Sequence, residues 1–331
     1  MSKVNIMGTD VENTEPKLKV EDLTSEQHIQ LMLAGIQGKD ELHTAWRELE
    51  EACRAHHNAQ VLIEAHQTFE NDKGLEAICS SEEAWNLTDT LKKTLEKFKS
   101  FFKKAFEYVN NFVVLRLSAS SGAIKKWAEI LGDSNNKKDR IEQMKKDYDT
   151  KDCTIEQMKT VIAEAETAFN KITGIAEQVK GLSPTSKNAS DIEKAQVISE
   201  LPEYKKFDEA YVNYEQSVPE GDNAGTTKAT TAEIGKWFDA GSVDSLYKEI
   251  DKVLVLVKNM KRMQMTCNAI VTSLEKSSSD ADGTDKNVND AKMKWLRDFS
   301  KNIMSGMISR LTKVASRAAS KCQTLTNMYN K

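Results

Sequence analysis

The chain has 331 residues, of which 39% are apolar and 30% charged, and its formal net charge is −4. Four prolines and fourteen glycines are few for this length, which favours long helices over the turn-rich sheets of β and α/β proteins. No segment reaches the roughly 18 uninterrupted apolar residues of a spanning helix, so the sequence predicts no transmembrane helix. The N-terminus lacks the pattern of a secretory signal peptide, and we expect a protein that is not secreted by that route. The five cysteines are scattered and odd in number, which predicts free thiols in a reducing compartment.

The N-terminal part of the chain is acidic. Residues 1–22 are polar and acidic, and we expect a disordered arm there. Residues 23–76 predict an acidic helical segment in which two helices meet near Gly35–Gly38, because glycine disfavours a helix interior. The helical pattern is lost over residues 71–81.

The segment from Trp85 to Val114 predicts a basic amphipathic helix. Apolar residues recur in it every three or four positions, which is the spacing of one helical stripe, and lysines largely fill the other side. Ser80 with Glu83 forms a capping-box pattern that predicts the start of this helix. Small residues over Ser118–Gly122 predict a break, and a short helix ending at Gly132 follows.

The next part predicts a helical pair, at residues 137–148 and 154–180. Gly181 is the expected stop of the second helix. Low hydrophobicity over residues 217–231 then predicts a linker. We place a helical bundle before this linker, at residues 77–216.

Residues 232–331 predict a C-terminal helical module. It contains a strongly apolar helix over residues 243–276 and ends in a basic helix over residues 288–328. No stretch of the chain shows sustained period-two alternation. The predicted fold is therefore all-α: an elongated bundle of long antiparallel helices with essentially no sheet.

Positive charge gathers in two regions of this acidic chain. Residues 92–126 hold nine basic and two acidic side chains, a net charge of +7, and residues 286–331 hold ten and two, a net charge of +8. The rest of the chain carries −19. Two interpretations follow: the basic helices pair with acidic neighbours inside the bundle, or they form a surface for nucleic acid or another anion. The residues predicted for anion contact are Lys92, Lys93, Lys97, Lys99, Lys103, Lys104, Arg116, Lys125, Lys126, Arg297, Lys301, Arg310, Lys313, Arg317 and Lys321.

The sequence carries no recognisable catalytic motif. Cys53 and His57 are four residues apart on a predicted helix, but no pattern supplies the further ligands of a zinc site or the orienting group of a nucleophile. Phosphate-binding glycine loops and the HExxH and GxSxG motifs are absent from the sequence. We expect no enzymatic activity, no cofactor and no metal.

The layout of the chain resembles the internal head proteins, or inner-body-like structural proteins, of large tailed bacteriophages. The residues that carry this resemblance are Ala84 to Phe112 and Ile303 to Tyr329, with an acidic N-terminal part before them. The resemblance implies a virion protein packaged with DNA inside the capsid, with other virion or scaffold proteins as partners.

The resemblance also implies processing by a phage protease after a small-x-Glu triplet. Four triplets fit this pattern: Gly74-Leu75-Glu76, Ser80-Ser81-Glu82, Ala105-Phe106-Glu107 and Ser273-Leu274-Glu275. Gly74-Leu75-Glu76 is the best placed of them, because it lies in the break before the basic helix. Cleavage there would make residues 1–76 a propeptide and change the net charge of the remainder from −4 to +4.

Two other interpretations stay open. In the first, the protein is a membrane-active helical bundle, pore-forming or lysis-associated, that contacts the membrane through residues 98–117. The burial preference of phenylalanine favours a core position for Phe101 and Phe102 instead. In the second, the protein is a scaffold in the host cytoplasm that binds other proteins and forms a stable homo-oligomer.

Overall fold

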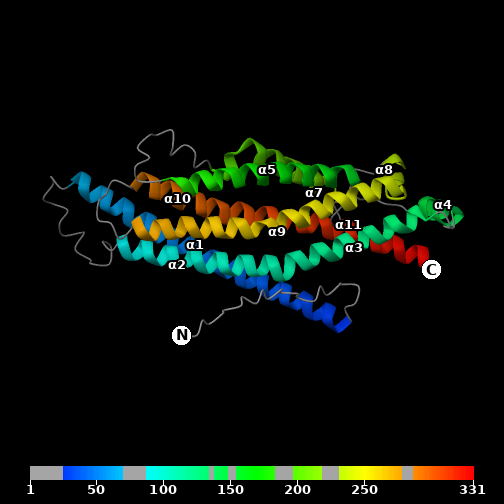
Figure 1. Cartoon of the computed structure of the whole chain (residues 1–331), viewed down its shortest axis with the longest axis horizontal. Helices are drawn as coiled ribbons and strands as arrows, with labels where there is room; N and C mark the ends of the chain where they lie inside the picture. Colours follow the sequence, from blue (N-terminus) through cyan, green and yellow to red (C-terminus); the bar gives the residue numbers. More distant parts are fainter. Residues whose placement is uncertain are drawn as a thin grey trace, which may run out of the picture.

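The computed structural model describes residues 25–69, 87–133, 138–147, 154–182, 197–217, 231–277 and 286–331. Within these ranges every regular element is helical and no residue belongs to a strand. The helices run along the long axis of an elongated bundle (Figure 1). The predicted all-α bundle is confirmed for the part of the chain that the structure describes.

Two helical lines extend through most of the bundle. The first line consists of α2 (Leu87–Tyr108), the π-helical segment η2 (Val109–Val113) and α3 (Val114–Gly132). The second line consists of α10 (Lys286–Phe299), the π-helical segment η6 (Ser300–Met307) and α11 (Ile308–Asn330). The residues that flank each π segment keep right-handed helical dihedral angles, so each line continues without a break.

The two lines run parallel to each other. The ring of Phe102 lies 6.3 Å from that of Phe299, and further along both lines the ring of Trp127 lies 6.5 Å from that of Tyr329. Helices α1 (Ser25–Phe69) and α9 (Ala240–Ser277) pack antiparallel to the first line. The bundle therefore combines the predicted antiparallel packing with parallel packing of these two lines, which are neighbours in space and distant in sequence.

The remaining helices complete the described structure. They are α4 (Lys138–Asp147), α5 (Ile155–Gly181), the 3₁₀ turn η3 (Ile198–Glu200), α7 (Pro202–Ser217) and α8 (Thr231–Lys236). The predicted helical pair corresponds to α4 and α5, and α5 ends at Gly181 as predicted. Proline at the first position of α7 fits a helix start, because that position needs no backbone N–H donor.

The prediction that two helices meet near Gly35–Gly38 is wrong, because α1 continues through both glycines. These glycines serve close packing. A Cβ atom at Gly35 would overlap the ring of Phe112, and one at Gly38 would lie 3.0 Å from Cδ2 of Tyr108. The contact between α1 and the first line therefore uses the small size of glycine and not its helix-breaking tendency.

The predicted break at Ser118–Gly122 is also wrong, because these residues lie inside α3. Ser120 and Ser121 are buried, and α3 packs against α9 and α11. Small side chains let these helix backbones approach closely, and this packing overrides the weak helix propensity of serine and glycine.

Buried side chains from both ends of the chain form one hydrophobic cluster. Phe101 and Phe102 are 0% exposed, so their predicted core position is confirmed. Full burial of such a side chain is worth about 1.5–3 kcal/mol. Trp127 and Trp237 belong to the same cluster, so the segments on either side of the predicted linker share a core. Most of that linker, residues 218–230, lies outside the described residues.

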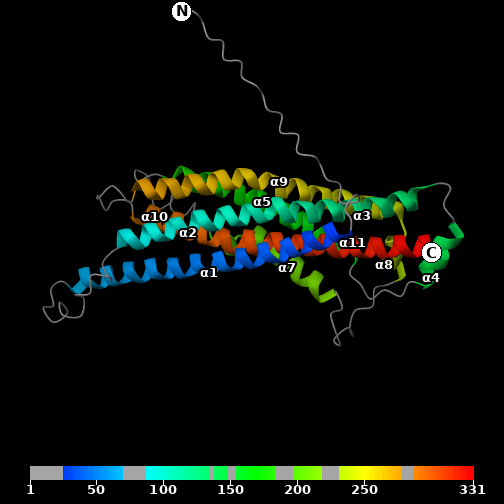
Figure 2. The ribbon, with the colours of Figure 1, turned by 90° about the horizontal axis from the view of Figure 1, so that it is seen from below.

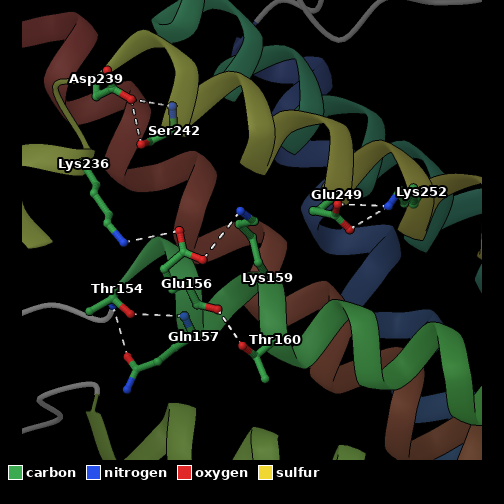
Figure 3. A network of polar contacts seen from close by, with 10 residues as sticks. All are labelled: Thr154, Glu156, Gln157, Lys159, Thr160, Lys236, Asp239, Ser242, Glu249 and Lys252. Carbon is green, nitrogen blue, oxygen red and sulfur yellow. Dashed lines mark hydrogen bonds and ion pairs between the residues drawn. The ribbon is translucent and has the colours of Figure 1, made fainter.

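Polar contacts fix the N-terminal ends of α5 and α9 (Figure 3). The hydroxyl of Thr154 accepts a hydrogen bond from the backbone N–H of Gln157 at 3.1 Å, and Oε1 of Gln157 accepts one from the N–H of Thr154 at 3.2 Å. This capping box satisfies N–H groups that have no partner within the helix. Lys236 of α8 lies 3.4 Å from the carboxylate of Glu156, and Asp239 accepts two hydrogen bonds at the start of α9.

Among the described residues, no helix combines the length and the apolar character that crossing a bilayer requires.

Candidate anion-contact surface

The fifteen predicted contact residues lie on the two helical lines. Nine belong to the first line, on α2 and α3, and the other six belong to the second line, on α10, η6 and α11. The two lines are in direct contact, since Nε of Arg116 donates a hydrogen bond to Oγ of Ser316 at 2.8 Å. What each cation does therefore depends on whether it points toward a neighbouring helix or toward solvent.

Two lysines of α2 pair with carboxylates of neighbouring helices. Nζ of Lys97 lies 2.9 Å from the carboxylate of Glu48 on α1, and Nζ of Lys99 lies 2.6 Å from that of Glu275 on α9. The hydrogen bond from Lys97, followed by its positive charge, lowers the pKa of Glu48. These two lysines thus contribute to helix–helix contacts on either side of α2.

The basic residues of α11 face an acidic and aromatic side of α7. Arg310 pairs with Asp208, and its guanidinium lies 4.8 Å from the ring centroid of Tyr211. Lys313 lies 2.7 Å from the carboxylate of Glu215, which Arg317 also contacts. A cation that is held by both a carboxylate and an aromatic ring is less available to an external anion.

Burial and ion pairing act in opposite directions on Glu215. Burial raises its pKa, and the hydrogen bonds and positive charges of Lys313 and Arg317 lower it; the lowering prevails, so the carboxylate stays ionised. Glu215 is therefore the acidic centre of the contact between α7 and α11.

Lys321 lies inside the bundle. It is 7% exposed, and its Nζ is 4.6 Å from the ring centroid of Trp237. Trp127 donates a hydrogen bond to the backbone carbonyl of Trp237 at 2.8 Å, which holds the backbone of Trp237 against α3. In this arrangement Lys321 serves packing within the bundle.

Three further predicted contacts are more exposed than Lys321: Arg297, Lys125 and Lys301. Arg297 lies 3.7 Å from the carboxylate of Glu50 on α1, and Lys125 lies 3.8 Å from Glu129 one turn away on α3. Lys301 on η6 is exposed. Pairs as exposed as Lys125 and Glu129 contribute at most about 1 kcal/mol and leave the cation accessible.

Four lysines of the first line point to solvent: Lys92, Lys93, Lys103 and Lys126, here called the exposed lysines. Within the described ranges, none of these four forms an ion pair with another side chain. Lys104 is half-buried beside α1, and its charge contributes to lowering the pKa of Glu48. The exposed lysines are the predicted contacts best placed to meet an external anion.

Sequence reasoning missed the carboxylates that neutralise the other cations. Asp208 and Glu215 are seven residues apart on α7, and Arg310 and Arg317 are seven apart on α11, so each pair lies on one helical stripe. The matched spacing shows that these charges could pair if α7 and α11 were neighbours. It does not show that α7 and α11 are neighbours, because that is a property of the tertiary fold.

The remaining candidates give no chemical site. Cys53 is buried, and burial raises the pKa of its thiol to about 11, which is opposite to what an activated thiolate needs. In the described part of the chain, no three His, Cys, Asp or Glu side chains are grouped to hold a metal ion. The predicted processing triplet Gly74-Leu75-Glu76 lies outside the described residues.

Comparisons with known proteins give no further assignment: no family model, no curated protein and no solved structure matches this chain. The arrangement of charge described above is therefore the basis on which a function can be argued.

Proposed function

We propose that this protein is a non-enzymatic structural protein of a phage head and that it binds packaged DNA through the exposed lysines of the first helical line. The observation that carries the proposal is the contrast between the two basic regions. Carboxylates of α7 and the ring of Trp237 engage Arg310, Lys313, Arg317 and Lys321, whereas the exposed lysines have no such partner among the described residues.

The geometry suits a long polyanion. Lys92 and Lys126 are 34 positions apart on one nearly continuous helical line, which corresponds to about 50 Å at 1.5 Å per residue. A rod with lysines distributed over this length can contact several phosphates of one duplex. Such binding is independent of base sequence, because phosphate contacts carry no sequence information.

The burial of the aromatic residues argues against the membrane-active alternative. Insertion of residues 98–117 would require Phe98, Phe101 and Phe102, all 0% exposed, to leave the core. The scaffold alternative predicts binding to neither DNA nor lipid and a stable oligomer, so the same experiments separate it from our proposal.

The test is binding of the full-length chain to a 20-bp duplex at several salt concentrations. Each phosphate contact adds about −0.9 to the slope of log K against log salt. The four exposed lysines therefore predict a slope of about −3 or steeper. Replacing Lys92, Lys103 and Lys126 together by glutamine is expected to remove most of this slope. The matched control replaces Lys171, Lys205 and Lys206, which are exposed on α5 and α7, and should leave the slope unchanged.

Absence of binding at 50 mM salt would refute the proposal. Leakage of liposomes at modest protein concentration would favour the membrane-active alternative. A stable oligomer that binds neither DNA nor lipid would favour the scaffold.

A further inference from the structure

The first helical line has a gap in its positive charge. Between Lys104 and Lys125 it carries a single basic residue, Arg116, which is exposed and directs its side chain to Ser316 of α11, on the second line. The gap spans about 30 Å of helix at 1.5 Å per residue. A straight polyanion that contacts both Lys103 and Lys125 would therefore pass over this part of the bundle.

Helix α9 carries cations in its middle part, outside the two basic regions at residues 92–126 and 286–331. Residues 252–274 contain four Lys or Arg and no Asp or Glu. Lys258 and Arg262 are exposed, and in the described structure neither forms an ion pair. Two apolar side chains near them on the same helix are also exposed: Val255, three residues before Lys258, is 52% exposed, and Met265, three residues after Arg262, is 69% exposed.

The register of α9 aligns these cations with the gap. α9 runs antiparallel to the first line, and the pair between Lys99 and Glu275 fixes the alignment. Arg262 and Lys258 lie 13 and 17 residues before Glu275, about 20 and 26 Å along the helix. They are therefore level with positions near 112 and 116 of the first line, between Lys103 and Lys125. Figures 1 and 2 both show α9 beside α2 and α3, in agreement with the packing of these helices.

We infer that Lys258 and Arg262 of α9 form the middle of the DNA-contact surface, joining the lysines of α2 to those of α3. This inference rests on the proposed function and extends it to a second helix. The resulting line of cations runs from Lys92 through Arg262 and Lys258 to Lys126. Its length of about 50 Å matches about 15 base pairs at 3.4 Å per pair, so we expect a binding-site size near 15 bp.

Acidic side chains limit the strength of this surface. Glu96 and Glu107 are exposed on α2, Asp251 is exposed on α9, and Glu129 pairs with Lys125 on α3. Duplex DNA therefore meets isolated cations separated by carboxylates and not a uniform positive field. This predicts binding that is strong at low salt and lost near physiological ionic strength.

The first test replaces both α9 cations by glutamine, as Lys258→Gln with Arg262→Gln, in the full-length chain. Loss of two phosphate contacts is expected to lower the salt slope by about 2 and to weaken binding at least about tenfold at 0.1 M salt. The control pair Lys171→Gln with Lys205→Gln removes the same charge from exposed positions on α5 and α7 and should change neither quantity.

The second test uses the unaltered protein. Met265 lies one turn from Arg262 and is exposed, so dilute hydrogen peroxide should oxidise it readily. Saturating duplex is expected to slow this oxidation at least fivefold, as followed by peptide mass spectrometry. Met328, at the end of α11 beside α4, is the internal reference and should oxidise at an unchanged rate.

The two claims fail in different ways. If the variant of Lys92, Lys103 and Lys126 loses binding while the α9 variant and Met265 oxidation are unaffected, the inference about α9 is refuted and the proposed function stands. If the unaltered protein binds phosphatidylserine vesicles but no duplex, both are refuted.

Discussion

Gly35 of α1 lies so close to the ring of Phe112 that a methyl group at position 35 would overlap it. Phe112 belongs to the π segment η2, so a side chain from the π-helical turn of the first line packs against α1 at a position that has no side chain. This contact has a direct consequence for stability.

Gly35→Ala is expected to lower the free energy of unfolding by about 1–2 kcal/mol, because overpacking outweighs the gain in helix propensity of about 1 kcal/mol. Gly38→Ala should cost less, since its Cβ would lie 3.0 Å from a Tyr108 ring that can shift. The control Gly174→Ala, with nothing within 4 Å, should be neutral or stabilising. Urea denaturation measures all three, and equal effects at positions 35 and 174 would contradict the packing argument.

The contact between Lys321 and Trp237 predicts a second effect on stability. Lys321→Ala removes a buried cation–π contact and the packing of the lysine stem, with an expected cost of about 2 kcal/mol. Lys321→Met keeps most of the packing and should cost about half as much. Lys331→Ala, at an exposed position, is the control and should have no measurable effect. If alanine and methionine lowered the free energy of unfolding equally, the charge of Lys321 alone would stabilise the contact with Trp237, and the packing of its stem would contribute nothing.

Local periodicity was sufficient to predict the class of the fold and most helices. The stripes of α5 and α9 match their predicted ranges to within a few residues because each buries one continuous face. Periodicity predicted helix breaks at Gly35–Gly38 and at Ser118–Gly122, where the chain is helical. The small residues there make room for a packed neighbour, and the local sequence does not show which neighbour that is. The tertiary partner, and not the propensity, decides the conformation there.

The same limit applies to the candidate surface. The sequence identified both basic regions, but it could not distinguish the lysines of α2 that face solvent from the cations of α11 that face α7. Arg317 and Lys103 carry the same charge in the sequence and have different neighbours in the bundle. The charge pattern did not single out Lys258 and Arg262, because α9 as a whole is mixed in charge and only its middle part, residues 252–274, lacks acidic side chains.

The acidic centre of the contact between α7 and α11 predicts a salt-dependent contribution. Glu215→Gln leaves Lys313 and Arg317 without their carboxylate and is expected to lower the free energy of unfolding by about 1–2 kcal/mol at low salt. The difference from the unaltered protein should shrink in 0.5 M NaCl, because salt screens partly exposed pairs. Glu209→Gln, exposed on the same helix, is the matched control. A loss that is independent of salt would assign the role of Glu215 to packing.

His56 predicts how stability responds to mild acid. Burial between α1 and the first line is the main effect on His56, and it lowers the pKa of the imidazole below the ordinary value of 6.5. The charge of Asp290 raises this pKa and the charge of His57 lowers it, and the net shift is downward. The unfolded chain therefore binds this proton at a higher pH than the folded protein does. The free energy of unfolding should be constant above about pH 7 and fall as the pH drops below 6.5, by at most about 1.4 kcal/mol per pH unit. Urea titrations between pH 7.5 and 5.5, above the range of most carboxylates, measure this. His56→Gln should flatten the dependence, whereas His43→Gln, at an exposed position, should leave it unchanged. A slope that survives in His56→Gln would assign the acid sensitivity to other groups.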